Sequence, residues 1–218
     1  MPHETLLIAT GNAGKRREIK QVLDSVGLQL QLTDLSAFPN LLEPVEDAPD
    51  FAGNARLKAL YYAKHTRLLT LADDSGLEVD SLGGEPGVHS ARYAGLPCDD
   101  AANNAKLIGA LANIPQSERA ARFVCYMVLA ENDKILAEMV GRIEGQIIFQ
   151  PRGQNGFGYD PLFLIPSLGK TTAELPPEHK NQISHRGQAS RQMALRLGQL
   201  ISQGSEIRSQ KSAGTDNE

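Results

Sequence analysis

The sequence has no tryptophan and only two cysteines, Cys98 and Cys125, among its 218 residues. Two cysteines are too few for a disulfide framework, and their spacing is not that of metal ligands, so we expect reduced thiols in a reducing compartment. Residues 1–4 lack the basic and apolar regions of a signal peptide. No apolar run is long enough to span a bilayer. We therefore expect a cytoplasmic protein with no membrane partner.

The charge balance lacks the basic excess that is typical of proteins that bind nucleic acid. The formal net charge is -4, and neutralising a phosphate backbone requires a basic surface, so we expect no nucleic-acid partner. A small phosphorylated ligand requires only a local basic pocket. Hydrophobic residues make up 41% of the chain, which is enough for a sizeable core in one domain.

The first residues alternate between strand and helix patterns. Residues 5–10 form an apolar run that predicts a buried strand, and residues 15–26 carry apolar side chains at helical spacing before Gly27. Leucines alternate with polar residues over residues 28–32, which favours a second strand. The order strand, helix, strand predicts an α/β fold.

The same patterns predict the remaining elements. We expect helices over residues 51–66, 99–112 and 186–201, and strands over residues 68–72, 77–82, 121–130, 135–148 and 162–165. The two long strands are expected to form an antiparallel pair, and residues 172–184 to form a broken helical segment. Residues 1–202 are expected to form one domain, and the polar residues 203–218 a disordered tail.

Two polar segments follow predicted strands. Thr10 to Lys15 lies between a strand and a helix, where backbone N–H groups bind phosphate readily; the alternative is an ordinary turn with a surface lysine. Asp73-Asp74-Ser75-Gly76 is expected at the carboxyl end of a strand, where adjacent carboxylates suit magnesium. Its alternative is a common Asp-rich turn.

Two further polar segments lie in the second half of the chain. In the glycine-rich loop of residues 153–161, Phe157 can stack on a base, although its ring can equally pack into the core. Lys180, His185 and Arg186 lie near a helix start and can form hydrogen bonds with a planar acceptor, such as the carbonyl edge of a purine. Alone, they are better explained as a solvated charged cap.

Five motifs, in this order and spacing, closely resemble the inosine/xanthosine triphosphate pyrophosphatase family. They are Thr10-Gly11-Asn12 with Lys15, residues 72–77, residues 86–93, residues 156–161, and Ser184-His185-Arg186-Gly187 with Ala189. The likeness covers about residues 5 to 200. It implies an elongated mixed sheet flanked by helices, two lobes with a central active-site cleft, and usually a homodimer. It also implies cleavage of inosine and xanthosine triphosphates to monophosphate and pyrophosphate, with Mg2+ as cofactor.

The resemblance also implies roles for individual residues. Asp74 would be the general base and a magnesium ligand, and Ser75 would touch the substrate. The family has an acidic pair before the second helix; here Val45 replaces one position and Ala48 the usual glycine, so Glu46 is the second magnesium ligand that we expect. Residues expected to hold the triphosphate are Thr10, Gly11, Asn12, Ala13, Gly14, Lys15 and Lys58, and those expected around the base are Phe157, Gly158, Tyr159, Asp160, Lys180, His185 and Arg186.

These roles predict a mechanism of positioning and charge stabilisation. Asp74, or a metal-bound water oriented by it, would deliver the nucleophile to the α-phosphorus without a covalent intermediate. Lys15 and Lys58 would stabilise the leaving pyrophosphate, and Asp73 would support the site. Donors facing the 6-carbonyl edge would reject adenine, because its amino group leaves them unpaired. Rejection of guanine through its 2-amino group is a further hypothesis.

Three other functions are compatible with parts of the same pattern. The same chemistry on modified or pyrimidine nucleotides occurs in the related Maf-type pyrophosphatases, but the Ser184-His185-Arg186 motif favours the first reading. A nucleotide-binding regulatory module without turnover is disfavoured by the Asp73-Asp74 pair. A nucleic-acid-binding protein conflicts with the acidic balance.

Overall fold

A seven-stranded mixed sheet forms the frame of the molecule in the computed structural model, which describes residues 5–28 and 30–213, and only the backbone for residues 204–213. The strand order is β2-β1-β3-β4-β5-β6-β7. In that order β2 pairs with β1, and β1 with β3, in parallel. Every later pair, from β3 with β4 onward, is antiparallel. The strands are β1 (Thr5–Ile8), β2 (Gln31–Asp34), β3 (Leu69–Val79), β4 (Ala120–Glu131), β5 (Lys134–Ile147), β6 (Phe163–Ile165) and β7 (Lys170–Thr171). The predicted α/β class with an elongated mixed sheet is confirmed.

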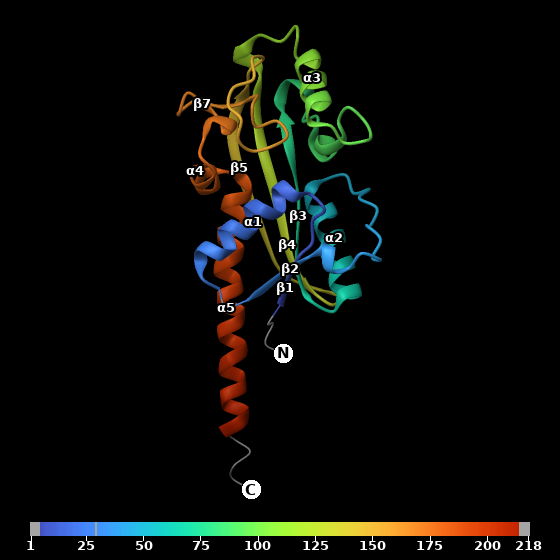
Figure 1. Cartoon of the computed structure of the whole chain (residues 1–218), viewed down its shortest axis with the longest axis vertical. Helices are drawn as coiled ribbons and strands as arrows, with labels where there is room; N and C mark the ends of the chain where they lie inside the picture. The colour runs from blue at the N-terminus through green and yellow to red at the C-terminus, as the bar shows by residue number, and fades with distance from the viewer. Residues whose placement is uncertain (1–4, 29, 214–218) are drawn as a thin grey trace.

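Helices cover both faces of this sheet, and the molecule is elongated along the three long strands (Figure 1). The helix α2 packs on one face, with α1 and α5 on the other, so alternate residues of β1 enter two different cores: Leu7 packs with α2, and Leu6 and Ile8 pack with α1 and α5. The helices are α1 (Ala13–Val26), α2 (Phe51–Thr66), α3 (Asp100–Ala110), α4 (Pro177–Ile183) and α5 (His185–Ala213).

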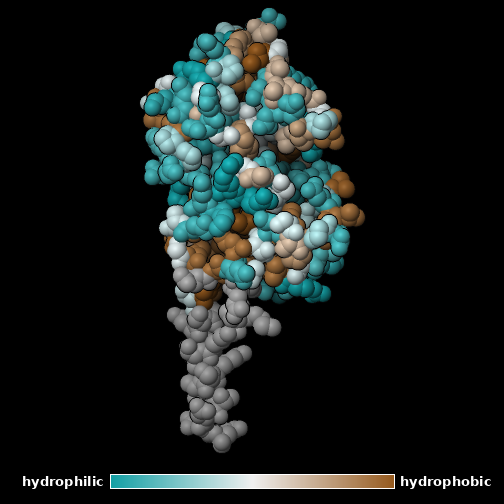
Figure 2. Space-filling view, in the orientation of Figure 1, coloured by the Kyte–Doolittle hydropathy of each residue, from teal (hydrophilic) through white to brown (hydrophobic). Residues whose placement is uncertain are grey.

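The helix starts follow from the capping residues in the sequence. Asn12, Asp50 and Asp99 each accept a backbone N–H of the first turn of α1, α2 and α3. Gly27 ends α1 in the left-handed conformation. The outward face of α1 is hydrophilic (Figure 2), as expected of a helix that buries only one side.

A second lobe is formed by the far ends of β3, β4 and β5 together with α3 and the segment from β6 to α4 (Figure 1). Its separate apolar core includes Leu77, Leu107, Phe123, Ile147 and Phe163. None of the described helices combines the length and the apolar character that crossing a bilayer requires.

The expected break at Asp73-Asp74-Ser75-Gly76 is wrong, because β3 continues through these residues to Val79. Pairing with β4 keeps them extended, with Asp73 opposite Met127 and Gly76 opposite Val124. What ends near this point is β1, whose pairing with β3 stops at Ile8 and Leu71. The acidic pair therefore lies where β3 loses one neighbour, and residues 77–79 belong to the same strand.

Other differences lie at the ends of elements. The second strand begins at Gln31 rather than at Leu28, residue 29 lies outside the described residues, and β7 is an additional short strand. The backbone of α5 continues past residue 202 to Ala213, while residues 214–218 lie outside the described part. The division of the chain into a domain and a tail at residue 202 stays a prediction.

Candidate active site

A cavity of about 480 Å³ lies at the carboxyl end of β1 and is lined by residues of both lobes. Between Ala72 and Leu77 the adjacent edge of β3 pairs with no described strand, so residues from both faces of β3 reach the hollow. Lys15, Asp74, Phe157 and His185 all contribute to the lining. The convergence that the sequence motifs require is therefore present in the fold.

The predicted phosphate loop closes one end of the cavity. Asn12 Oδ1 accepts the backbone N–H of Lys15 at 3.0 Å, and Thr10 Oγ1 accepts that of Asn12 at 3.3 Å. No acidic residue lies in the first turn of α1 to compete with an anion for its N–H groups. Thr10, Gly11, Asn12 and Lys15 line the cavity, whereas Ala13 and Gly14 do not.

Gly14 instead lets the glycine-rich loop approach α1. A Cβ at this position would lie 2.6 Å from the ring of Phe157, so the ring rests directly on the helix start. The ring is also near two cations, 5.2 Å from Lys180 Nζ and 5.5 Å from the Arg186 guanidinium carbon. Phe157 thus lies at the cavity wall rather than in the core, as the stacking hypothesis requires.

Asp73 and Asp74 point to opposite faces of β3, because neighbouring side chains alternate along a strand. Asp74 is buried and lines the cavity. Its Oδ2 accepts from Asn54 Nδ2 at 3.2 Å, and its Oδ1 lies 3.5 Å from Lys58 Nζ. Burial raises the pKa of the Asp74 carboxyl, although Lys58 and Lys15 oppose that shift.

Lys58 connects Asp74 with the other predicted metal ligand. Its Nζ lies 3.0 Å from Glu46 Oε2, and both carboxylates line the cavity. Although burial disfavours its charge, the neighbouring Asp74, Asp73 and Glu46 raise the pKa of Lys58. Among the described residues, no group of three or more His, Cys, Asp and Glu side chains is placed to hold a metal. A cation here would thus have two carboxylates from the chain and would need further ligands from substrate or water.

Asp73 is fully buried behind the cavity wall and contacts two of the basic side chains that line the cavity. Its Oδ2 lies 3.3 Å from Lys15 Nζ, 3.6 Å from Arg186 Nε and 3.1 Å from Ser75 Oγ. Burial opposes its ionisation, yet Lys15, Arg186 and Lys58 hold the pKa of Asp73 well below its ordinary value. Arg186 in turn donates to Ser75 Oγ at 2.7 Å. One carboxylate therefore orients both Lys15 of the predicted phosphate loop and Arg186 at the start of α5.

The solvated-cap reading of Lys180, His185 and Arg186 is wrong, because all three side chains are buried. Lys180 Nζ lies 2.8 Å from Glu18 Oε1 and 2.5 Å from Asp160 Oδ2, and Arg186 also pairs with Glu18. Although burial works against its ionisation, Arg186 and Lys180 lower the pKa of Glu18. These cations are held rigidly at the cavity wall, as recognition of a flat ring requires.

His185 starts α5 and stacks on Phe123, with ring centroids 4.8 Å apart and an interplanar angle of 14°. Its Nδ1 has no hydrogen-bond partner in the described part of the chain. Burial, followed by the charges of Arg186, Lys180 and Lys15, lowers the pKa of His185 well below 6.5. The shift favours the neutral ring, and its buried Nδ1 is left without a protein partner among the described residues.

The remaining predicted residues also reach the site. Glu46, Lys58, Ser75, Gly158, Tyr159 and Asp160 line the cavity. Sequence reasoning missed Glu18, whose signal is an acidic residue on the apolar face of α1 beside Ile19 and Val22. It also assigned no role to several other residues that line the cavity, among them Glu43, Tyr62, Ser90, Arg92, Cys98 and Asp100.

Comparison with known proteins gives one consistent result. The Ham1 family matches residues 6–195. The dITP/XTP pyrophosphatase of Desulforamulus reducens is 50% identical over 184 residues, which cover 84% of this chain and 90% of that protein. That of Lactobacillus acidophilus is 44% identical over 192 residues, or 87% and 95% of the two chains.

A solved structure of a HAM1 protein from Coxiella burnetii has a TM-score of 0.81 and 41% identity to this chain. The match covers 89% of this chain and 98% of that one. The resemblance seen in the sequence motifs is confirmed, since the family match spans both lobes and every segment that lines the cavity. The chain therefore belongs to the Ham1 family.

Proposed function

We propose that this protein hydrolyses the triphosphates of hypoxanthine and xanthine nucleosides, such as dITP, ITP and XTP, to the monophosphate and pyrophosphate, and so removes deaminated purines from the nucleotide pool. The names of the similar proteins support the substrate class. The observation that carries the proposal is the shared cavity, where the N-terminus of α1, the Asp74 carboxylate and the Phe157 ring face one hollow.

The residues of the cavity divide into a phosphate end and a base end. The first turn of α1 and the ammonium groups of Lys15 and Lys58 bind the triphosphate. Phe157 stacks on the purine, and Lys180, His185 and Arg186 donate to its carbonyl edge. Adenine has an amino group at that edge, which cannot accept a hydrogen bond from these donors, and this disfavours ATP.

Asp74 is the base that we propose for the reaction. Its carboxylate takes a proton from a water molecule, whose oxygen forms a bond to the α-phosphorus while the bond from that phosphorus to the bridging oxygen breaks. The pyrophosphate leaves with the electron pair of that bond and is stabilised by Lys15 and Lys58. The raised pKa of Asp74 improves its basicity over that of an exposed aspartate.

We propose Mg2+ as the cofactor, with Glu46 and Asp74 as its ligands. Five cationic and five carboxylate side chains line the cavity, so the protein alone leaves most of the charge of a triphosphate uncompensated. Carboxylate oxygens are the ligands that Mg2+ prefers, and the ion, when bound, withdraws charge from the phosphate oxygens.

The family likeness further supports a cytoplasmic homodimer as the working form of the protein. Sedimentation of the purified protein tests the dimer, and a monomer at assay concentrations would contradict it.

A nucleotide panel tests the activity. With Mg2+ at alkaline pH, we expect ITP, dITP and XTP to yield equal amounts of monophosphate and pyrophosphate, much faster than ATP or GTP, and EDTA to abolish turnover. Preference for pyrimidine or modified nucleotides would instead support the Maf-type reading. Binding of ITP without any pyrophosphate would support a regulatory module.

A further inference from the structure

Arg92 differs from every other cation that lines the cavity. The other four each form an ion pair with a carboxylate, Lys15 with Asp73, Lys58 with Glu46, Lys180 with Asp160 and Arg186 with Glu18. The guanidinium of Arg92 forms no hydrogen bond or ion pair with any residue that the structure describes. Its charge is the one in the lining that no side chain of the described chain compensates.

The backbone on both sides of Arg92 is held firmly. Asn103 Nδ2 donates to the carbonyl of Ala91 at 3.0 Å, and Asn103 Oδ1 accepts the N–H of Ala94 at 2.7 Å. Lys106 Nζ donates to the carbonyl of Tyr93 at 2.6 Å. The helix α3 therefore fixes the segment that carries Arg92, although the guanidinium itself is free.

The same segment is fixed to β3 just beyond the acidic pair. Ser90 Oγ accepts the N–H of Leu77 at 2.9 Å, and Tyr159 donates to the carbonyl of Ser90 at 2.8 Å. This contact requires Gly76, because a Cβ there would lie 2.3 Å from Ser90 Oγ. The short helix of residues 87–92 is thus seated against the strand that carries Asp74.

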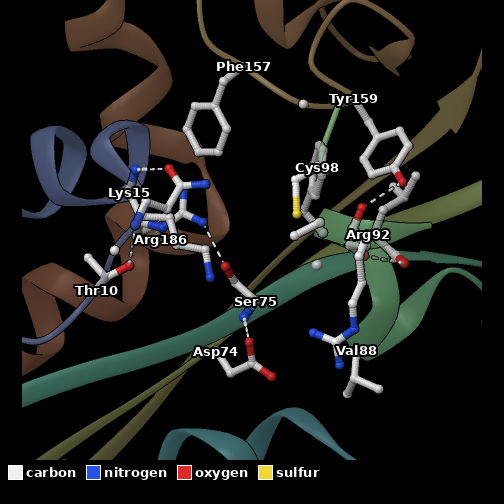
Figure 3. A pocket seen from close by; sticks show the side chains of 18 of the residues that line it. Thr10, Lys15, Asp74, Ser75, Val88, Arg92, Cys98, Phe157, Tyr159 and Arg186 are labelled. Atoms are coloured by element: carbon white, nitrogen blue, oxygen red, sulfur yellow. Dashed lines mark hydrogen bonds between the residues drawn. The ribbon is translucent and has the colours of Figure 1, made fainter. Parts of the chain in front are cut away.

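Arg92 reaches the cavity from the wall opposite the phosphate loop. In Figure 3 its guanidinium lies on the other side of Asp74 and Ser75 from Lys15 and Arg186. The nearest acidic lining residue in sequence, Asp100, is already engaged, since it accepts the N–H of Gly158 at 2.7 Å. A cation that a fixed backbone segment carries to the cavity, and that has no partner among the described residues, is well suited to an anionic ligand.

We propose that Arg92 is a further substrate-contacting residue, which donates to phosphate oxygens of the bound nucleotide. This inference rests on the proposed function. The phosphate chain is the anionic part of a nucleoside triphosphate, and guanidinium binds phosphate through two parallel hydrogen bonds. Arg92 would hold the chain from the second lobe while Lys15 and Lys58 hold it from the first, so that the reacting phosphorus lies between both walls and next to Asp74.

The test compares Arg92→Gln, Arg92→Lys and the control Arg17→Gln, which removes the same charge from an exposed side chain of α1 outside the cavity lining. Loss of one charge-stabilising donor typically costs a factor of about 100, and we expect that loss in kcat/KM for ITP in Arg92→Gln. Arg92→Lys should recover part of it, and Arg17→Gln should match the wild type. Thermal melting of each variant confirms that it is folded.

Inhibition by three probes locates the effect. Arg92→Gln should weaken inhibition by inosine monophosphate, pyrophosphate or both, and leave inhibition by inosine unchanged, since inosine has no phosphate. Turnover and both phosphate inhibitions within about twofold of wild type, or an equal loss of inosine binding, would overturn the assignment. Failure of the wild-type protein to hydrolyse ITP would instead refute the proposed function.

Discussion

Two neighbouring carboxylates, Asp73 and Asp74, have opposite environments. Asp73 is enclosed with cations on the α5 face of β3, which lowers its pKa, whereas burial dominates for Asp74 and raises its pKa. The alternation of side chains along an extended strand is sufficient to separate them. One carboxylate stays charged and orients cations, and the other faces the cavity as a base.

Replacing Asp74 by Asn should lower kcat for ITP by at least about a hundredfold, because the general base is lost while the shape of the side chain is kept. The melting temperature should stay close to that of the wild type. Asp47→Asn is the matched control, since Asp47 is exposed and does not line the cavity. Turnover near the wild-type rate in Asp74→Asn would remove Asp74 from the mechanism.

His185 should make the fold sensitive to mild acid. Unfolded histidine binds a proton below about pH 6.5, while burial and neighbouring cations lower the pKa of His185 in the folded protein. The unfolded state therefore binds more protons as the pH falls, and stability decreases in the window below about 6.5. Between pH 7.5 and 5.5, the free energy of unfolding of wild type should fall by about 1 kcal/mol more than that of His185→Asn. Equal pH dependence in urea denaturation would indicate a protonated imidazole in the folded state.

At the residue scale, the sequence predicts which side chains reach the site better than it predicts their partners. Lys180, His185 and Arg186 were identified from their motif, but the carboxylate that pairs with both Lys180 and Arg186 is Glu18, which is more than a hundred positions away in the chain. No local pattern reveals such a pairing. Arg92 lay within a recognised motif, and only the structure distinguishes it as unpaired.

At the scale of elements, α5 begins against β5 at a point where only glycine fits. A Cβ on Gly141 would lie 2.0 Å from the backbone carbonyl oxygen of His185. Close approach of strand and helix sets the position of the first turn of α5, and with it His185 and Arg186 at the cavity wall.

Gly141→Ala should therefore destabilise the fold by about 1–3 kcal/mol, the usual cost of overpacking, and raise KM for ITP as the start of α5 shifts. Gly109→Ala in α3 is the control, because a Cβ there meets nothing within 4 Å and should leave stability equal or slightly higher. Urea denaturation and steady-state kinetics measure both. An alanine at position 141 that leaves stability and KM unchanged would show that this contact does not position the helix.

Most elements were predictable because their apolar periodicity and caps are strong. Asp50 and Asp99 mark the starts of α2 and α3, as expected. The continuous strand β3 was not predictable, since an Asp-Asp-Ser-Gly run favours a turn and only pairing with β4 keeps it extended. The two-residue strand β7 is too short to give a pattern.

At the scale of the whole molecule, the long helix α5 has its buried contacts in its first half. The side chains that it buries in the core shared with α1 are Ala189, Met193, Ala194 and Leu197. Beyond them the helix leaves the body of the protein (Figure 1). The sequence-based boundary at residue 202 falls just after these contacts.

Removing residues 203–218 should leave both the melting temperature and kcat/KM for ITP unchanged, because no buried side chain of the described core and no cavity residue is lost. Thermal melting and the pyrophosphate assay compare the shortened and full-length chains. A lower melting temperature, or lower activity, in the shortened chain would assign the segment a structural or catalytic role.

The convergence of four distant segments on one cavity is a property of the topology, and sequence reasoning reached it only through the family resemblance. The strand order brings β1 and β3 together, while α5 brings residues near the end of the chain back to α1. Local patterns predict each segment but carry no information on which of them meet.

The position of bond cleavage tests this account most directly. ITP hydrolysed in water labelled with oxygen-18 should give inosine monophosphate that carries one labelled oxygen and pyrophosphate that carries none, because the water next to Asp74 attacks the α-phosphorus. Label in the pyrophosphate, or release of labelled inorganic phosphate, would contradict the account.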